Sequence, residues 1–187
     1  MIHPTRSLPT LALATLLAGG GASLAFAADP MVGGAPMMAN KTIVENASQA
    51  KNLTTLVAAV KEDGLVPTLS GPGPFTVFAP TNAAFDKVPK ATLDKLLQPD
   101  MKADLAKILT YHVVAGKIDA AEIEKNIKAD GGSYTMKTVE GEPLTAKMDG
   151  DKIALIDAKG TGALIETADV FQSNGVVHVI DSVLMPK

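Results

Sequence analysis

The spacing of hydrophobic residues divides the chain into a helical first part and a strand-rich second part. From residue 43 to residue 109, apolar side chains recur every three or four positions, which places them on one stripe of each helix. Asn52 stands where it would cap the second helix, and Gly64 stands where it would end it. Because each stripe is single-sided, we expect the helices to lie on an apolar surface. The predicted helical segments are 43–47, 53–60, 65–69, 93–97 and 100–109.

Short runs of apolar and β-branched residues follow, separated by turns that contain glycine. Asp149-Gly150 lies between two alternating runs, which indicates a hairpin. The last run is nearly all apolar, as is typical of a central strand covered on both faces. Helices followed by consecutive short strands predict an α+β fold, with one copy of the domain. The predicted strands are 135–139, 143–148, 152–156, 163–170 and 176–185.

The N-terminus has the pattern of an export signal. Arg6 precedes an apolar run at 8–17 that is too short to span a bilayer, and Ala25-Phe26-Ala27 matches the small-x-small cleavage pattern. We therefore expect a secreted or periplasmic protein with no membrane span after cleavage. The expected segments are a signal peptide at 1–27, a flexible leader at 28–40 and a folded domain at 41–187.

The leader contains Met31, Met37 and Met38, which leaves two interpretations open. Thioether side chains can hold a soft cation such as copper(I). Methionine also fills irregular gaps, so the same residues suit a leader that docks on the domain, and we favour this second interpretation.

Composition argues against several functional classes. The chain has no cysteine, so disulfides cannot stabilise it. Its formal net charge is −3, and its single arginine lies in the signal segment, so no guanidinium remains to make bidentate contacts with phosphate or guanine. Nucleic acid is therefore not expected as a partner. The sequence also lacks a nucleophile elbow, a His-Glu-x-x-His motif and a phosphate loop, so we expect no catalytic residue, metal or cofactor.

The segment 73–85 predicts a strand, a turn and a short helix. Alternation along the strand places its two phenylalanines on opposite faces, and the proline that follows has no N–H to continue the ladder. A threonine or the next asparagine then caps the helix, whose phenylalanine folds back onto the core. The residues with these roles are Phe75, Phe78, Pro80, Thr81, Asn82 and Phe85.

Two histidines lie beyond the signal segment. His112 follows a predicted helix, where we expect it to cap the last carbonyls as a cation near the negative end of the helix dipole. His178 shares a strand face with Val176 and Ile180, which predicts a buried, hydrogen-bonded imidazole. Two histidines so far apart in sequence give weak support for a zinc site.

Three segments resemble the two boxes and the Tyr-His motif of the fasciclin-like domain family in order and spacing. They are 73–85, 111–118 with Tyr111-His112, and 174–181 with Asn174, Gly175 and His178. The resemblance runs from about residue 41 to the C-terminus. It implies a β-wedge of short strands with a layer of N-terminal helices, and a role in adhesion.

The same resemblance implies candidate partner-binding residues. In animal matrix members, an Asp-Ile pair and the Tyr-His region are implicated in integrin binding. The matching positions here are Tyr111, His112, Asp169 and Val170. The flanking Ala168 and Phe171 depart from the animal pattern, which argues for a different partner.

We therefore expect an exported, monomeric, non-enzymatic module that binds a protein or polysaccharide at a surface. The alternative is a periplasmic carrier or stress protein, which would need a cavity of roughly several hundred Å³ lined by aliphatic side chains. A third hypothesis, an esterase-like enzyme, would need Ser, His and Asp within hydrogen-bond reach.

Overall fold

The computed structural model describes residues 29–96 and 98–187, so the expected signal peptide lies outside the described residues. Among these residues the main sheet has seven strands in the order β4-β3-β9-β8-β7-β6-β5. β3 and β9 are parallel, and the other neighbours are antiparallel. The strands are β1 (Met31–Val32), β2 (Ala35–Pro36), β3 (Phe75–Pro80), β4 (Val113–Ala115), β5 (Ser133–Lys137), β6 (Pro143–Asp149), β7 (Lys152–Ile156), β8 (Gly162–Gln172) and β9 (Gly175–Ile180).

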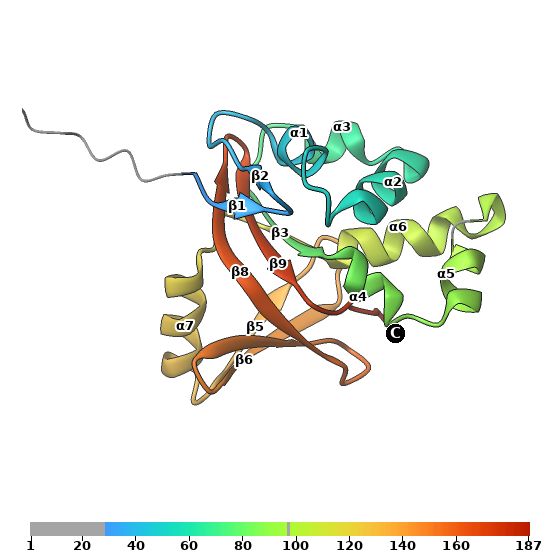
Figure 1. Cartoon of the computed structure of the whole chain (residues 1–187). Helices are drawn as coiled ribbons and strands as arrows, with labels where there is room; N and C mark the ends of the chain where they lie inside the picture. The colour runs from blue at the N-terminus through green and yellow to red at the C-terminus, as the bar shows by residue number, and fades with distance from the viewer. Residues whose placement is uncertain (1–28, 97) are drawn as a thin grey trace, which may run out of the picture.

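Helices cover both sides of the sheet. Figure 1 shows α1, α2, α3 and α6 gathered on one side of β3 and β9, while α7 lies on the other side of β8. The fold is therefore α+β, a wedge of short strands with a helical layer. The helices are α1 (Ile43–Ala47), α2 (Thr54–Asp63), α3 (Val66–Leu69), α4 (Asn82–Asp86), α5 (Lys90–Leu96), a 3-10 turn (Pro99–Met101), α6 (Lys102–Tyr111) and α7 (Ala120–Ala129).

Alternation along β3 and β9 separates two hydrophobic cores. Val77 and Val179 belong to the core under α1, α2 and α6. Phe78 and Ile180 point to the opposite face and join the core beneath α7. Since both faces of the two central strands are buried, their nearly continuous apolar sequence follows from their position.

The helix α7 and the edge strand β4 are absent from the sequence prediction. Asp119 caps α7, because its Oδ1 accepts a hydrogen bond from the Glu122 N–H at 2.8 Å. Ile123 and Ile127 on the inner face are buried. The Asp-x-x-Glu pattern with apolar residues four apart is the signal that could have found this helix.

The cap of α2 differs from the prediction. Leu53 occupies the N-cap position, and Asn52 supplies no cap: its Oδ1 is buried without a partner. The amide of Asn82, from the first turn of α4, instead accepts a hydrogen bond from Thr55 N–H at 3.1 Å and donates to Lys51 O at 3.1 Å. Thr81 caps α4, as one of the two predicted choices.

Residues 31–36, within the segment 28–40 that was expected to be a flexible leader, form the β1–β2 hairpin. Val32 and Met37 are buried against β8 and β9, whereas Met31 is 60% exposed. The docking expected of the leader methionines thus applies to Met37. The packed part of the chain therefore begins before residue 41.

Candidate functional site

Tyr111 ties the end of α6 to two loops of the sheet. Its ring is fully buried, and its hydroxyl donates to Pro143 O at 2.9 Å and accepts from Ala158 N–H at 3.0 Å. Burial raises the pKa of Tyr111 to about 12. The phenol therefore stays protonated at neutral pH and acts as a neutral cross-link in the core.

Removing this hydroxyl should destabilise the protein without changing the shape of the core. Tyr111→Phe leaves the Pro143 carbonyl and the Ala158 N–H without their partner, so we expect a loss of about 1–3 kcal/mol in the free energy of unfolding. Urea denaturation measures this loss. Tyr134→Phe, at a less buried ring of β5, is the matched control and should change little. An equal loss in both variants would contradict the proposed role of the Tyr111 hydroxyl.

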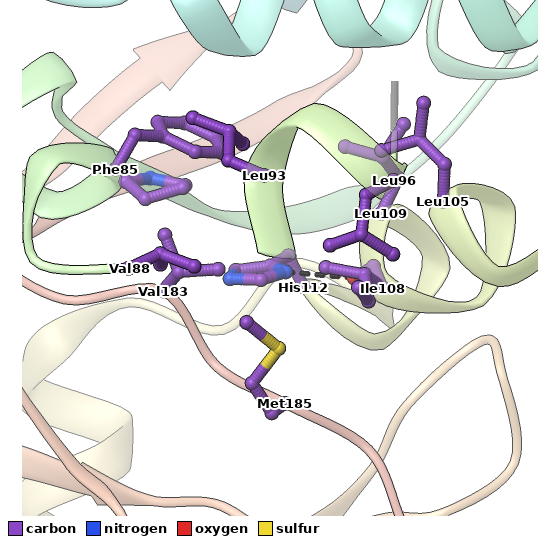
Figure 2. Close-up of a pocket in the computed structure, with 11 residues that line it drawn as sticks. Phe85, Val88, Leu93, Leu96, Leu105, Ile108, Leu109, His112, Val183 and Met185 are labelled. Carbon is purple, nitrogen blue, oxygen red and sulfur yellow. Dashed lines mark hydrogen bonds between the residues drawn. The ribbon is translucent and has the colours of Figure 1, made fainter. Parts of the chain in front are cut away.

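His112 links α6 to the C-terminal segment. Its Nδ1–H donates to Ile108 O at 2.7 Å, and its Nε2 accepts from Leu184 N–H at 3.0 Å. Figure 2 shows the imidazole between Ile108 and the side chains of Val183 and Met185. Burial lowers the pKa of His112 to about 4. The expectation of a cationic cap is therefore wrong: the imidazole that caps the helix is neutral. Burial destabilises the charged form of the ring by more than the helix dipole stabilises it.

Two carboxylates hold the rest of the C-terminal segment. Asp157 Oδ2 accepts from Met185 N–H and Glu142 Oε2 accepts from Lys187 N–H, each at 2.9 Å. The predicted last strand ends early, at Ile180, because side chains rather than a strand ladder bind the residues that follow. Asp157 Oδ1 also accepts from Lys159 N–H and from Thr161 N–H in the tight turn after β7. The bond from Lys159, two positions on, is an Asx pattern that the sequence of this turn could have indicated.

Asp169 lies at a β-bulge in β8, where the pairing with β9 shifts register. Its backbone has φ 58°, and its Oδ1 accepts from Ala120 N–H at the start of α7 at 2.7 Å. A carboxylate at this end of a helix is favoured by the helix dipole. The bulge thus positions Asp169 to join β8 to α7.

His178 lies beneath Asp169 in β9. Its Nδ1 accepts from Asp169 N–H at 3.3 Å, and its Nε2–H donates to Ile118 O at 2.9 Å. The ring stacks on Phe78 with the centroids 5.6 Å apart. Burial lowers the pKa of His178, so this imidazole is also neutral at neutral pH. It is buried and hydrogen-bonded, as predicted.

Among the four candidate partner-binding residues, three have almost fully buried side chains. The exposed fractions are 0% for Tyr111, 2% for His112 and 1% for Val170, whereas Asp169 is half-buried. As placed, a partner can reach only the Asp169 side chain directly. Partner binding by the other three stays a prediction, and would require the core to open.

Asn174 holds the turn between β8 and β9 against the helical layer. Its Oδ1 accepts from Ile43 N–H at 3.1 Å, and its Nδ2 donates to Leu69 O at 2.7 Å and to Gly71 O at 3.2 Å. Beside it Gly175 pairs with Phe75 across β3 and β9. The Asn-Gly pair of the second box thus fixes where the first box enters the sheet.

Two apolar hollows lie beside His112, and both are small. One, of about 20 Å³, is drawn in Figure 2 and lies between α5, α6 and the C-terminal segment. The other, of about 30 Å³, lies between α1, α2 and β3. Each has room for a water molecule but not for an organic ligand. A groove of about 360 Å³ lies at the surface, along residues 72–74 and 172–175.

Within residues 29–96 and 98–187, no group of three or more His, Cys, Asp or Glu side chains is arranged to hold a metal ion. In the same part of the chain, none of the helices has both the length and the apolar character needed to cross a membrane.

Comparison with known proteins identifies the family of the chain. The family model of the fasciclin domain matches residues 51–186. Protein sll1483 of Synechocystis sp. is 48% identical over 145 residues, which cover 78% of this chain and 73% of that protein. The cell surface glycolipoprotein MPB83 of Mycobacterium bovis is 40% identical over 154 residues, which cover 80% of this chain and 62% of that protein.

Among solved structures, the FAS1 domain pair from the insect cell adhesion molecule Fasciclin I aligns with a TM-score of 0.47 and 23% identity. The alignment covers 68% of this chain and 40% of that one. The family match spans most of the chain and includes all three sequence boxes. The chain therefore belongs to the fasciclin domain family.

Proposed function

We propose that this protein is an exported, non-enzymatic binding module that attaches to a protein or polysaccharide partner at a cell surface. The observation that carries the proposal is that the polar side-chain atoms of Tyr111, His112 and His178 are all hydrogen-bonded within the protein. The Tyr111 hydroxyl and both nitrogens of His112 and His178 make hydrogen bonds inside the protein. These groups stabilise a rigid scaffold, and neither imidazole is free to act as a general base.

Relatives and chain organisation support a surface location. MPB83 is described as a cell surface glycolipoprotein. The N-terminal 27 residues of this chain have the composition of an export signal, and its formal net charge of −3 is modest. We infer a secreted or periplasmic protein that acts as a monomer. The organism's own envelope or matrix would supply its partner.

The test is retention of the purified protein on native material. We expect saturable binding to an envelope or extracellular-matrix fraction, measured by sedimentation across a range of protein concentrations. Asp169→Asn removes the charge of the half-buried candidate contact while keeping an oxygen acceptor and a residue that tolerates positive φ. Asp151→Ala, at the exposed turn between β6 and β7, is the control. Absence of saturable retention would contradict adhesion, and equal retention by both variants would remove Asp169 from the contact surface.

The carrier alternative receives little support from the interior. A small apolar ligand needs several hundred Å³ in a typical site, about ten times the volume of either hollow beside His112. Close-packed side chains from both layers fill the space between sheet and helices. Adhesion through the outer surface is therefore the better-supported function.

A further inference from the structure

The groove along residues 72–74 and 172–175 has the features of a preformed binding site; we call it the β3-entry groove. Its volume is about 360 Å³, and Lys117 completes its lining. The Asn174 side chain makes hydrogen bonds to the backbone of Ile43, Leu69 and Gly71, and these bonds fix one wall of the groove. A rigid wall loses little conformational entropy when a ligand binds.

The glycines of the groove are required by close packing of the backbone. A Cβ on Gly73 would lie 2.0 Å from Asn174 O, and a Cβ on Gly175 would lie 2.0 Å from Phe75 O. Two backbone segments therefore meet at the floor of the groove without side chains between them. The floor of the groove is therefore set by backbone atoms, while Lys117 lines it as an exposed side chain.

The charge of the groove is positive although the chain is acidic. Lys117 is the one ionisable residue in its lining, and its Nζ lies 4.6 Å from the centroid of the Phe171 ring. The ion pairs found in the described part of the chain, Lys87–Asp181 and Lys128–Glu124, do not include this ammonium group, whose contact is with the face of the Phe171 ring. The carboxylate of Asp119, two positions further on, instead caps α7. An anionic ligand is therefore favoured.

The rim offers flat apolar surfaces and a hydroxyl group. Phe171 is 37% exposed, Pro72 and Pro74 lie in the lining, and Ser173 is exposed. An exposed aromatic side chain beside a polar groove is a common anchor for a ligand. Flat apolar faces with neighbouring hydroxyl and ammonium groups suit the rings, hydroxyls and carboxylates of an acidic sugar.

An extended peptide is less well suited to this groove. Peptides that add to a sheet need unpaired backbone groups at a strand edge. At the entry to β3 these groups are already paired: Gly116 N–H donates to Pro74 O at 3.0 Å, and Phe75 N–H donates to Asn174 O at 3.1 Å. The glycine floor also provides no deep apolar pocket for a peptide side chain.

We propose that the β3-entry groove binds a polyuronate, a polysaccharide whose sugar units carry carboxylates, with Lys117 pairing with a carboxylate and Phe171 contacting a sugar ring. This inference rests on the proposed function and names its partner class. Because an exposed ion pair is screened by salt, the affinity should fall as ionic strength rises.

The experiment measures binding of the full-length purified protein to alginate at low ionic strength by isothermal titration calorimetry. Dextran serves as the neutral polysaccharide and polyglutamate as the acidic peptide. We expect binding to alginate that weakens by about fivefold or more in Lys117→Gln and in Phe171→Ala, the size of effect typical of an interface anchor. The controls Lys137→Gln and Val139→Ala change an exposed lysine and a 46% exposed apolar residue on and beside β5, and should bind like the unchanged protein.

Three results would overturn the assignment: no binding to alginate, equal weakening by the control variants, or binding to polyglutamate as tight as to alginate. All four substituted residues are exposed, so melting temperatures should stay close together and verify folding. If alginate fails while the protein is still retained on its native envelope, the groove assignment is wrong and adhesion stands. If retention is absent as well, the proposed function fails with it.

Discussion

Replacing Gly175 by alanine is expected to lower the free energy of unfolding by about 3 kcal/mol or more. A Cβ at this position would lie 2.0 Å from Phe75 O and 2.9 Å from Phe75 C. Both atoms are backbone, so no side-chain rotation can relieve the overlap. The methyl group of alanine would therefore force apart the parallel pairing of β3 and β9, which begins at Phe75 and Gly175. The effect on stability should be large, because both hydrophobic cores pack on these two strands.

A matched control exists within the same sheet. Gly162 also begins a strand, but a Cβ there would lie 3.7 Å from the flexible end of Ile156, an ordinary contact. Gly162→Ala should therefore change stability by no more than about 0.5 kcal/mol. Thermal and urea denaturation of both variants test the difference. A Gly175→Ala protein as stable as Gly162→Ala would show that β3 and β9 do not approach this closely in solution.

Acidification is expected to destabilise the protein through His112. Its ordinary pKa of 6.5 falls to about 4 in the folded state because the ring is buried. As the pH drops through 6.5, His112 binds a proton in the unfolded chain but stays neutral in the folded chain. The stabilisation from neutral His112 is thus fully present above pH 6.5 and is lost as the pH falls toward 4. Its full size is about 3 kcal/mol, of which about 2 kcal/mol is lost between pH 7 and pH 5.

Urea denaturation at several pH values from about 7 to about 5 tests this expectation, and the window lies above the usual titration range of carboxylates. His112→Gln should lower stability at neutral pH but show a shallower dependence on pH. His178 contributes in the same direction, because burial lowers its pKa too, so His178→Gln should also flatten the curve. A pH dependence unaltered by either substitution would contradict the buried, neutral histidines.

Protonation of His112 has a specific structural consequence. The Nε2 atom that accepts from Leu184 N–H would become a donor, so this link to the C-terminal segment would be lost. The same segment is held at Met185 and Lys187 by the carboxylates of Asp157 and Glu142. We therefore expect the protection factor of the Leu184 N–H, which is its exchange rate relative to that of an unfolded chain at the same pH, to fall first on acidification.

The sequence alone determined the features that depend on neighbouring residues. Alternation placed Phe75 and Phe78 on opposite faces of β3, and Asp149-Gly150 marked the turn between β6 and β7. Gly64 ends α2 in the left-handed conformation, φ 77°, which glycine adopts without strain. These features depend on the backbone geometry of a few neighbouring residues, so each short segment of sequence is enough to predict them.

Only the tertiary structure decided which distant groups meet. Asn82 caps α2 from 27 positions away, where local spacing had favoured Asn52. His112 is neutral because the folded chain buries it completely, and no neighbour in sequence reveals that. The last residues leave β9 because His112, Asp157 and Glu142 bind their backbone, and the β3-entry groove forms because β3 meets the β8–β9 turn. Burial and long-range hydrogen bonds arise only when separate segments pack together, so the pattern of residues along the chain could not specify them.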